Sequence, residues 1–362
     1  MSNFNGITEM KSFFIGKYEI KLPIVQGGMG VGVSLNGLAS AVANEGGVGV
    51  ISAAGLGLLY PGYKGSYSEK CIYGLRQEIR KAREKTYGVI GINIMVALSN
   101  FSDMVRTAVS ENADVIFAGA GLPLDLPGYL TEGSRTQLVS SSRAARLICE
   151  KWSANYGYLP DAIVVEGPKA GGHLGFKKEQ IEDEHYSLEH LIPEVVEVAR
   201  SYAGRKNIPV IAAGGIATGE DIARFMALGA SAVQMGSIFV PTEECDASVE
   251  FKKVYLNAHR EDIRIIQSPV GMPGRAFDGE FIRNVAEGKE KPRSCPFHCI
   301  KTCDYTRSPY CIIKALYNAA KGNMKKGYAF AGGNAYLSDK IRSVREVVEK
   351  LKTDFFLSKA AF

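Results

Sequence analysis

The chain has 362 residues, of which 46% are hydrophobic and 22% charged, and its formal net charge is +5. These values suit a folded, enzyme-sized core, and because the positive charge is spread along the chain without an arginine-rich or aromatic-rich tract, we expect no nucleic-acid partner. The weakly charged stretch 35–59 holds Asn44, Glu45 and six glycines, so we expect no membrane span there. The polar N-terminus, with Glu9 and Lys11, does not resemble a signal peptide, which predicts a cytoplasmic protein with reduced cysteines.

Short apolar runs alternate with helical patterns along the first 240 residues. The predicted strands are 24–28, 48–52, 89–96, 114–119, 137–140, 162–165, 208–215 and 232–236. The predicted helices are 35–44, 68–85, 101–111, 143–156, 188–202 and 218–229, the last capped by Thr218 and ended by Gly229. This rhythm predicts an α/β fold of the (β/α)₈ TIM-barrel type. A doubly wound sheet is the alternative, but no strand is followed by the full dinucleotide-binding glycine fingerprint and its acidic residue.

The pattern changes after residue 237. A charged helix is predicted at 246–259, and a Pro- and Gly-rich loop at 268–275 marks the end of the regular barrel. Residues 276–328 form a basic, cysteine-bearing segment, and a last helix is predicted at 338–352. We therefore divide the chain into a barrel, 1–275, and a helical, cysteine-containing C-terminal extension, 276–362.

One glycine-rich turn stands out as a place for chemistry. The buried strand 162–165 runs directly into a turn that contains Gly171, Gly172 and His173. Glycine lets the backbone approach a ligand closely, and barrel enzymes place their working residues at the carboxyl ends of strands. A titratable imidazole at such a position is a candidate catalytic group. The alternative is a loop histidine without a role.

Other predicted strand ends carry small or amide side chains. Gly214, Gly215, Gly236 and Ser237 end the seventh and eighth strands, where barrels commonly bind a phosphate group. Tight turns without a ligand are the alternative. Gln26 and Asn93 offer amides to a polar heterocycle, so a phosphorylated planar cofactor, flavin mononucleotide (FMN), satisfies both features.

Five ordered motifs resemble the nitronate monooxygenase family, formerly called 2-nitropropane dioxygenases, which also includes flavin-type enoyl-acyl-carrier-protein reductases. The likeness covers about residues 18–280. The motifs are Pro23-Ile-Val-Gln-Gly-Gly-Met, Gly91-Ile-Asn-Ile, Glu166-Gly-Pro-Lys-Ala-Gly-Gly-His, Pro209-Val-Ile-Ala-Ala-Gly-Gly-Ile and Gln234-Met-Gly-Ser.

The resemblance implies a barrel that binds FMN non-covalently, with His173 as the active-site residue. It implies that the flavin ring lies along Gln26, Gly27, Gly28, Met29 and Asn93, that Lys169, Ala170, Gly171 and Gly172 flank ring and substrate, and that Gly214, Gly215, Gly236 and Ser237 take the phosphate. Two positions depart from the pattern. Glu166 stands where many nitronate oxidisers have Gln and would place a carboxylate near the flavin, and Lys169 stands where they have Glu. Both departures leave the substrate open.

The resemblance implies an FMN-dependent oxidoreductase that oxidises alkyl nitronates with O₂. His173 would then stabilise the anionic nitro group or the developing flavin charge, or remove the α-proton of a nitroalkane. The alternative enzyme is an NAD(P)H-dependent enoyl-thioester reductase in which His173 donates a proton. A third possibility is a flavin- or phosphate-binding protein without turnover. In each case the partner is a small molecule, and a homodimer is one oligomeric state to consider.

The extension contains a second candidate site. Cys295, Cys299 and Cys303 are spaced by four residues and Cys311 follows. All-thiolate ligation suits an iron–sulfur cluster, which we favour, or zinc, and His298 could replace one ligand. The spacing matches neither a standard ferredoxin run nor a zinc ribbon, so reduced cysteines in a compact helical cap are the alternative.

Overall fold

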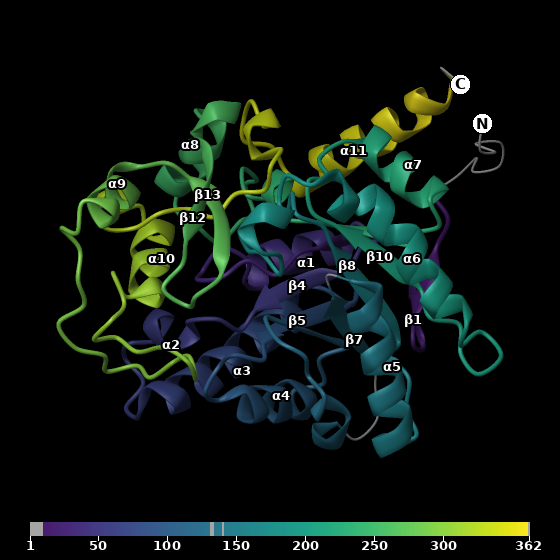
Figure 1. Ribbon diagram of the computed structural model, residues 1–362, viewed down its shortest axis with the longest axis horizontal. Helices are drawn as coiled ribbons and strands as arrows, with labels where there is room; N and C mark the ends of the chain where they lie inside the picture. The colour runs from purple at the N-terminus through teal and green to yellow at the C-terminus, as the bar shows by residue number, and fades with distance from the viewer. Residues whose placement is uncertain (1–9, 131–133, 140, 361–362) are drawn as a thin grey trace.

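The chain folds around eight parallel strands that close into a barrel (Figure 1). The computed structural model describes residues 10–130, 134–139 and 141–360. The barrel strands are β3 (Ile24–Gln26), β4 (Gly49–Ser52), β5 (Ile90–Met95), β6 (Val115–Gly119), β7 (Ser134–Val139), β8 (Ala162–Glu166), β10 (Val210–Ala213) and β11 (Ala232–Met235). They lie in the order β3-β11-β10-β8-β7-β6-β5-β4, and a parallel bridge between Val25 and Val48 joins the two ends. The predicted (β/α)₈ barrel is therefore confirmed.

Helices cover the outside of the barrel (Figure 1). They are α1 (Asn36–Asn44), α2 (Leu56–Leu59), α3 (Tyr67–Lys85), α4 (Phe101–Ser110), α5 (Ser142–Tyr156), α6 (Leu188–Arg200), α7 (Gly219–Ala227) and α11 (Val344–Ala360). The predicted cap is confirmed, because the Thr218 hydroxyl accepts the backbone N–H of Asp221 and the Asp221 carboxylate accepts that of Thr218. Within the described residues, no helix is both long and apolar enough to cross a lipid bilayer.

The barrel interior is closed at the amino ends of the strands. The hairpin of β1 (Phe13–Ile15) and β2 (Tyr18–Ile20) packs Phe13, Ile15 and Ile20 into one cluster with apolar residues near the strand starts, such as Val48 and Val115. These residues are buried, and this plug leaves the carboxyl ends of the strands as the open face of the barrel.

The C-terminal half departs from the prediction in two places. The predicted loop 268–275 is wrong in its second half, because β13 (Pro273–Phe277) pairs antiparallel with β12 (Ile263–Gln267) and with the short strand β9 (Gly172–His173). Proline is tolerated there since it stands first in its strand. The predicted last helix begins late, at Val344, because Ser343 caps it by accepting the N–H of Glu346.

The remaining helices of the C-terminal half lie at the open face. They are α8 (Val249–Leu256), α9 (Glu280–Ala286) and α10 (Ile312–Ala320), and they stand with the β12–β13 hairpin on one side of the barrel in Figure 1. The last helix, α11, returns to pack beside α7 on the outside of the barrel. The extension thus both covers the open face and closes the outer ring of helices.

Candidate active site

A cavity of about 490 Å³ opens at the carboxyl ends of the barrel strands. This volume lies in the range of sites that enclose a cofactor or a drug-sized ligand. The structure brings most of the predicted site residues together on its wall. These are Gly27, Gly28, Met29, Asn93, Glu166, Ala170, Gly171, Gly172, His173, Gly214, Gly215, Gly236 and Ser237.

Two predicted site residues do not line this cavity. Gln26 is fully buried, accepts the N–H of Val50 with Oε1 at 3.0 Å and donates from Nε2 to the Gly27 carbonyl at 2.5 Å. Its amide therefore joins β3 to β4 beneath the cavity and does not face it. Lys169 has an exposed side chain, while its backbone carbonyl accepts the N–H of Gly333 at 2.9 Å.

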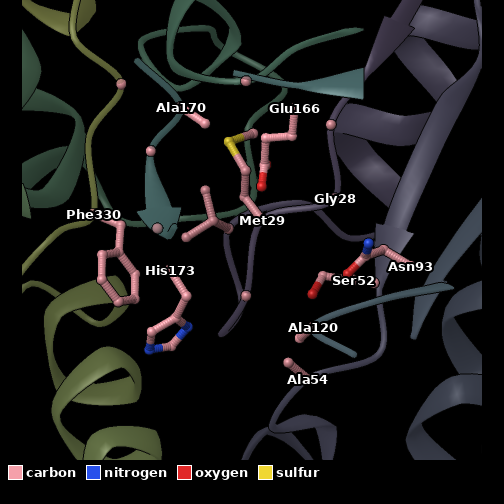
Figure 2. A pocket seen from close by; sticks show the side chains of 18 of the residues that line it. Gly28, Met29, Ser52, Ala54, Asn93, Ala120, Glu166, Ala170, His173 and Phe330 are labelled. Carbon is pink, nitrogen blue, oxygen red and sulfur yellow. The ribbon is translucent and has the colours of Figure 1, made fainter. Parts of the chain in front are cut away.

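His173 faces the cavity from β9. Its Nε2 lies 2.7 Å from the Ser268 hydroxyl, and its ring meets that of Phe330 edge-on, with centroids 5.1 Å apart. Figure 2 shows the two rings side by side, across the cavity from Ala54 and Ala120. Burial lowers the pKa of His173 to about 4, because removal from water disfavours the charged imidazolium. The ring is therefore neutral near pH 7 and keeps one nitrogen that can accept a proton.

Glu166 ends β8 and points into the same cavity, close to Met29 (Figure 2). Burial raises the pKa of its carboxyl to about 8. The carboxylate expected near the flavin is therefore corrected to a carboxylic acid that is mostly protonated at neutral pH. In this form Glu166 can donate a hydrogen bond and does not repel an anion.

Glycines form much of the rest of the wall, so the backbone itself faces the cavity there. A Cβ on Gly28 would stand 2.3 Å from Cβ of Asn93, so a side chain would displace the amide that faces the cavity. Gly214 and Gly215 follow β10 with φ of 102° and 77°, a left-handed conformation that glycine adopts at little cost. These tips of β10 and β11 are open toward the cavity, which suits backbone recognition of a phosphate.

Part of the wall was missed by sequence reasoning because it comes from the extension. Phe330, Gly332 and Asn334 line the cavity. The Gly332 N–H donates to the Ser237 hydroxyl at 2.9 Å, and the Asn334 side chain donates to the Gly215 carbonyl at 2.6 Å. The Gly-Gly-Asn sequence at 332–334 is a local signal for a close backbone approach, but nothing in it indicates which strand tips it meets.

The four cysteines of the extension are brought together elsewhere. Cys295, Cys299, Cys303 and Cys311 line a second, smaller cavity of about 170 Å³, together with His298. Within the described residues, no three Cys, His, Asp or Glu side chains are placed to hold a single metal ion. The other three cysteines of the chain are buried singly, as expected for packing thiols.

A glycine-lined cavity at the open end of a barrel, with small-residue strand tips and a part-buried imidazole, fits a flavin. The chain is a flavin-dependent oxidoreductase with a TIM-barrel fold. A model of the nitronate monooxygenase family matches residues 11–127 and 130–354, and the chain belongs to this family.

Individual relatives are distant. A probable nitronate monooxygenase of Staphylococcus aureus (strain Newman) is 25% identical over 310 residues, which cover 79% of this chain and 82% of the relative. The structure of FabK from Thermotoga maritima is 28% identical, covers 94% of both chains and has a TM-score of 0.71. Nitroalkane oxidase from Streptomyces ansochromogenes, at 22% identity and a TM-score of 0.71, shares the fold over 94% of this chain and 98% of its own.

Proposed function

We propose that this protein is an FMN-dependent nitronate monooxygenase, which oxidises alkyl nitronates with O₂. The observation that carries the proposal is a part-buried, neutral His173 facing a glycine-lined cavity at the carboxyl ends of the strands. The family match and the relatives named as probable nitronate monooxygenases support the same reaction.

The residues that line the cavity fit both the ring and the phosphate of FMN. Gly28, Met29 and Asn93 offer a close backbone and an amide to the flat ring. The glycine tips of β10 and β11 offer backbone N–H groups to the phosphate. FMN, when bound, supplies the redox chemistry, and the chain's own residues bind and orient the substrate.

His173 and Glu166 together suit an anionic substrate. A neutral imidazole donates a hydrogen bond from one nitrogen, and a protonated Glu166 donates from its hydroxyl, so both can hold a nitro group without opposing its charge. An anion beside the ring raises the pKa of His173, because it favours the imidazolium. The hydroxyl of Ser268, 2.7 Å from Nε2, fixes the ring in this orientation. Ionisation of Glu166 above about pH 8 would repel the anion, and activity with nitronates should fall there.

A second candidate is an NAD(P)H-dependent enoyl-thioester reductase. The likeness to FabK over 94% of the chain favours it. In that reaction His173 would have to donate a proton, and a pKa of about 4 leaves very little imidazolium at pH 7. This is the physical reason for placing the reductase second.

The two reactions are separated by their co-substrates. O₂ consumption with an alkyl nitronate is measured in one assay, and anaerobic oxidation of NADH or NADPH with a crotonyl thioester in the other. We expect nitronate-dependent O₂ consumption that His173→Ala lowers strongly and His190→Ala leaves unchanged, since His190 is exposed on α6. Turnover only in the anaerobic assay would establish the reductase. Bound flavin without turnover in either assay would support a binding protein.

A further inference from the structure

The second cavity lies in the segment between α9 and α10, and four thiols line it. We propose that Cys295, Cys299, Cys303 and Cys311 bind an iron–sulfur cluster in this cavity. The proposal goes beyond the flavin-dependent activity and does not depend on it. Four thiolates are the usual ligands of such clusters.

The arrangement of the four cysteines in the described chain favours a cluster over a single zinc ion. Around one tetrahedral zinc ion the four sulfurs would converge to about 3.8 Å from one another, given Zn–S bonds of about 2.3 Å. Within the described residues no such convergence of ligands occurs. Here the four cysteines instead line a cavity of about 170 Å³. Iron and sulfide atoms between the thiolates would occupy that space.

The cysteine segment is fixed to the barrel. Residues 289–311 contain no helix or strand, and connections of this length without regular structure are usually functional or disordered. Three contacts argue against disorder. An antiparallel bridge joins Ile300 to Leu98, the Ser99 N–H donates to the Cys299 carbonyl at 3.1 Å, and the Ser99 hydroxyl donates to the His298 carbonyl at 2.6 Å. The sulfurs are therefore held at the mouth of the barrel, next to the end of β5.

Polar groups aimed at the sulfurs suit negatively charged thiolates. The His298 N–H lies 3.4 Å from Sγ of Cys295, and His298 adopts a left-handed φ of 44° to place it there. Cys311 is the N-cap of α10, so it stands at the positive end of that helix's dipole. A helix N-terminus and N–H donors both stabilise a thiolate ligand.

The two cavities share a wall. Cys299, Ile300 and Ile312 line both the cysteine cavity and the larger cavity of the proposed flavin site. A cluster bound here would stand directly beside the flavin cavity, separated from it by these side chains. This is a suitable place for a one-electron carrier that serves a redox cofactor.

The experiment is metal and sulfide analysis of the full-length protein, purified without oxygen and then reconstituted with ferrous iron and sulfide. We expect equal amounts of iron and acid-labile sulfide, about two or about four of each per chain. Reduction with dithionite should give a low-temperature electron paramagnetic resonance signal of the iron–sulfur type. Zinc without sulfide, disulfides between the four cysteines, or no bound iron would each overturn the proposal.

Variants test which sulfurs are ligands. Alanine at position 295, 299, 303 or 311 should each remove most of the bound iron and sulfide, whereas Cys149→Ala, in the buried face of α5, should retain both. Flavin content and the thermal unfolding midpoint of each variant check that the barrel has folded. Iron and sulfide retained at the wild-type level in folded variants at all four positions would overturn the assignment. If a variant does not fold, the spectrum of the wild-type protein decides alone.

Discussion

Replacing Glu166 by Gln tests the electrostatics of the cavity directly. A carboxyl whose pKa rises from 4.5 to about 8 on folding costs up to about 5 kcal/mol of stability once it is ionised in the folded protein. The folded protein holds the proton of Glu166 more tightly than the unfolded chain does, so the free energy of unfolding falls as the pH rises. The pKa of Glu166 is raised in the folded state. The stability that the protein gains from keeping Glu166 protonated is therefore fully present below pH 4.5 and is lost as the pH rises to about 8.

The assay compares flavin-free wild-type protein with Glu166→Gln by urea unfolding at a series of pH values. Groups that titrate in both proteins cancel in the difference, so the free energy of unfolding of Glu166→Gln relative to wild type should increase by about 2.5 kcal/mol between pH 5 and pH 7. Where unfolding is not reversible, the difference in thermal midpoint should grow in the same direction. A difference that stays constant from pH 5 to pH 8 would refute the reasoning, because the carboxyl would then be ionised at its ordinary pKa.

Three further substitutions probe the site and the core. Gly171→Ala places a Cβ 2.7 Å from the carbonyl carbon of Ala331, and this backbone cannot move away easily. The amount of flavin bound per chain, measured by absorbance, should therefore fall. An unchanged flavin content would contradict this prediction. Ser268→Ala removes the partner of His173 Nε2 and should lower kcat about fivefold, a loss of about 1 kcal/mol that Ser268→Thr restores. Trp152→Ala empties a fully buried position and should lower the free energy of unfolding in urea by about 3–5 kcal/mol. A decrease of less than about 1 kcal/mol would show that the side chain is not tightly packed.

The barrel could be predicted because its signals are local. Each strand is a short apolar run, and the cap formed by Thr218 and Asp221 lies within four residues of sequence. The same locality explains the error at β13. Its proline and glycines resemble a turn, but all five of its residues pair with the nearby β12, and Gly274 also pairs with His173, about a hundred residues away in sequence.

The candidate site was predicted less completely, for physical reasons that a sequence does not contain. Motif likeness placed Gln26 at the ring, but the side chain instead satisfies backbone groups between two strands. The charge of Glu166 depends on its burial, which only the fold determines. The wall supplied by Phe330 carries no motif, and its contact with the barrel joins segments far apart in the chain.

Residues that follow the barrel strands contribute to the burial that keeps His173 neutral. The strand β9 has only two residues and needs a neighbour to persist. That neighbour is β13, where Gly274 pairs with His173. Ala276 of β13 forms an antiparallel bridge with Phe330, and this pairing brings the Phe330 ring against the imidazole of His173. The burial that keeps the imidazole neutral therefore comes partly from residues about a hundred or more positions after it, so the chemistry of this barrel site is tuned by the segment that covers it.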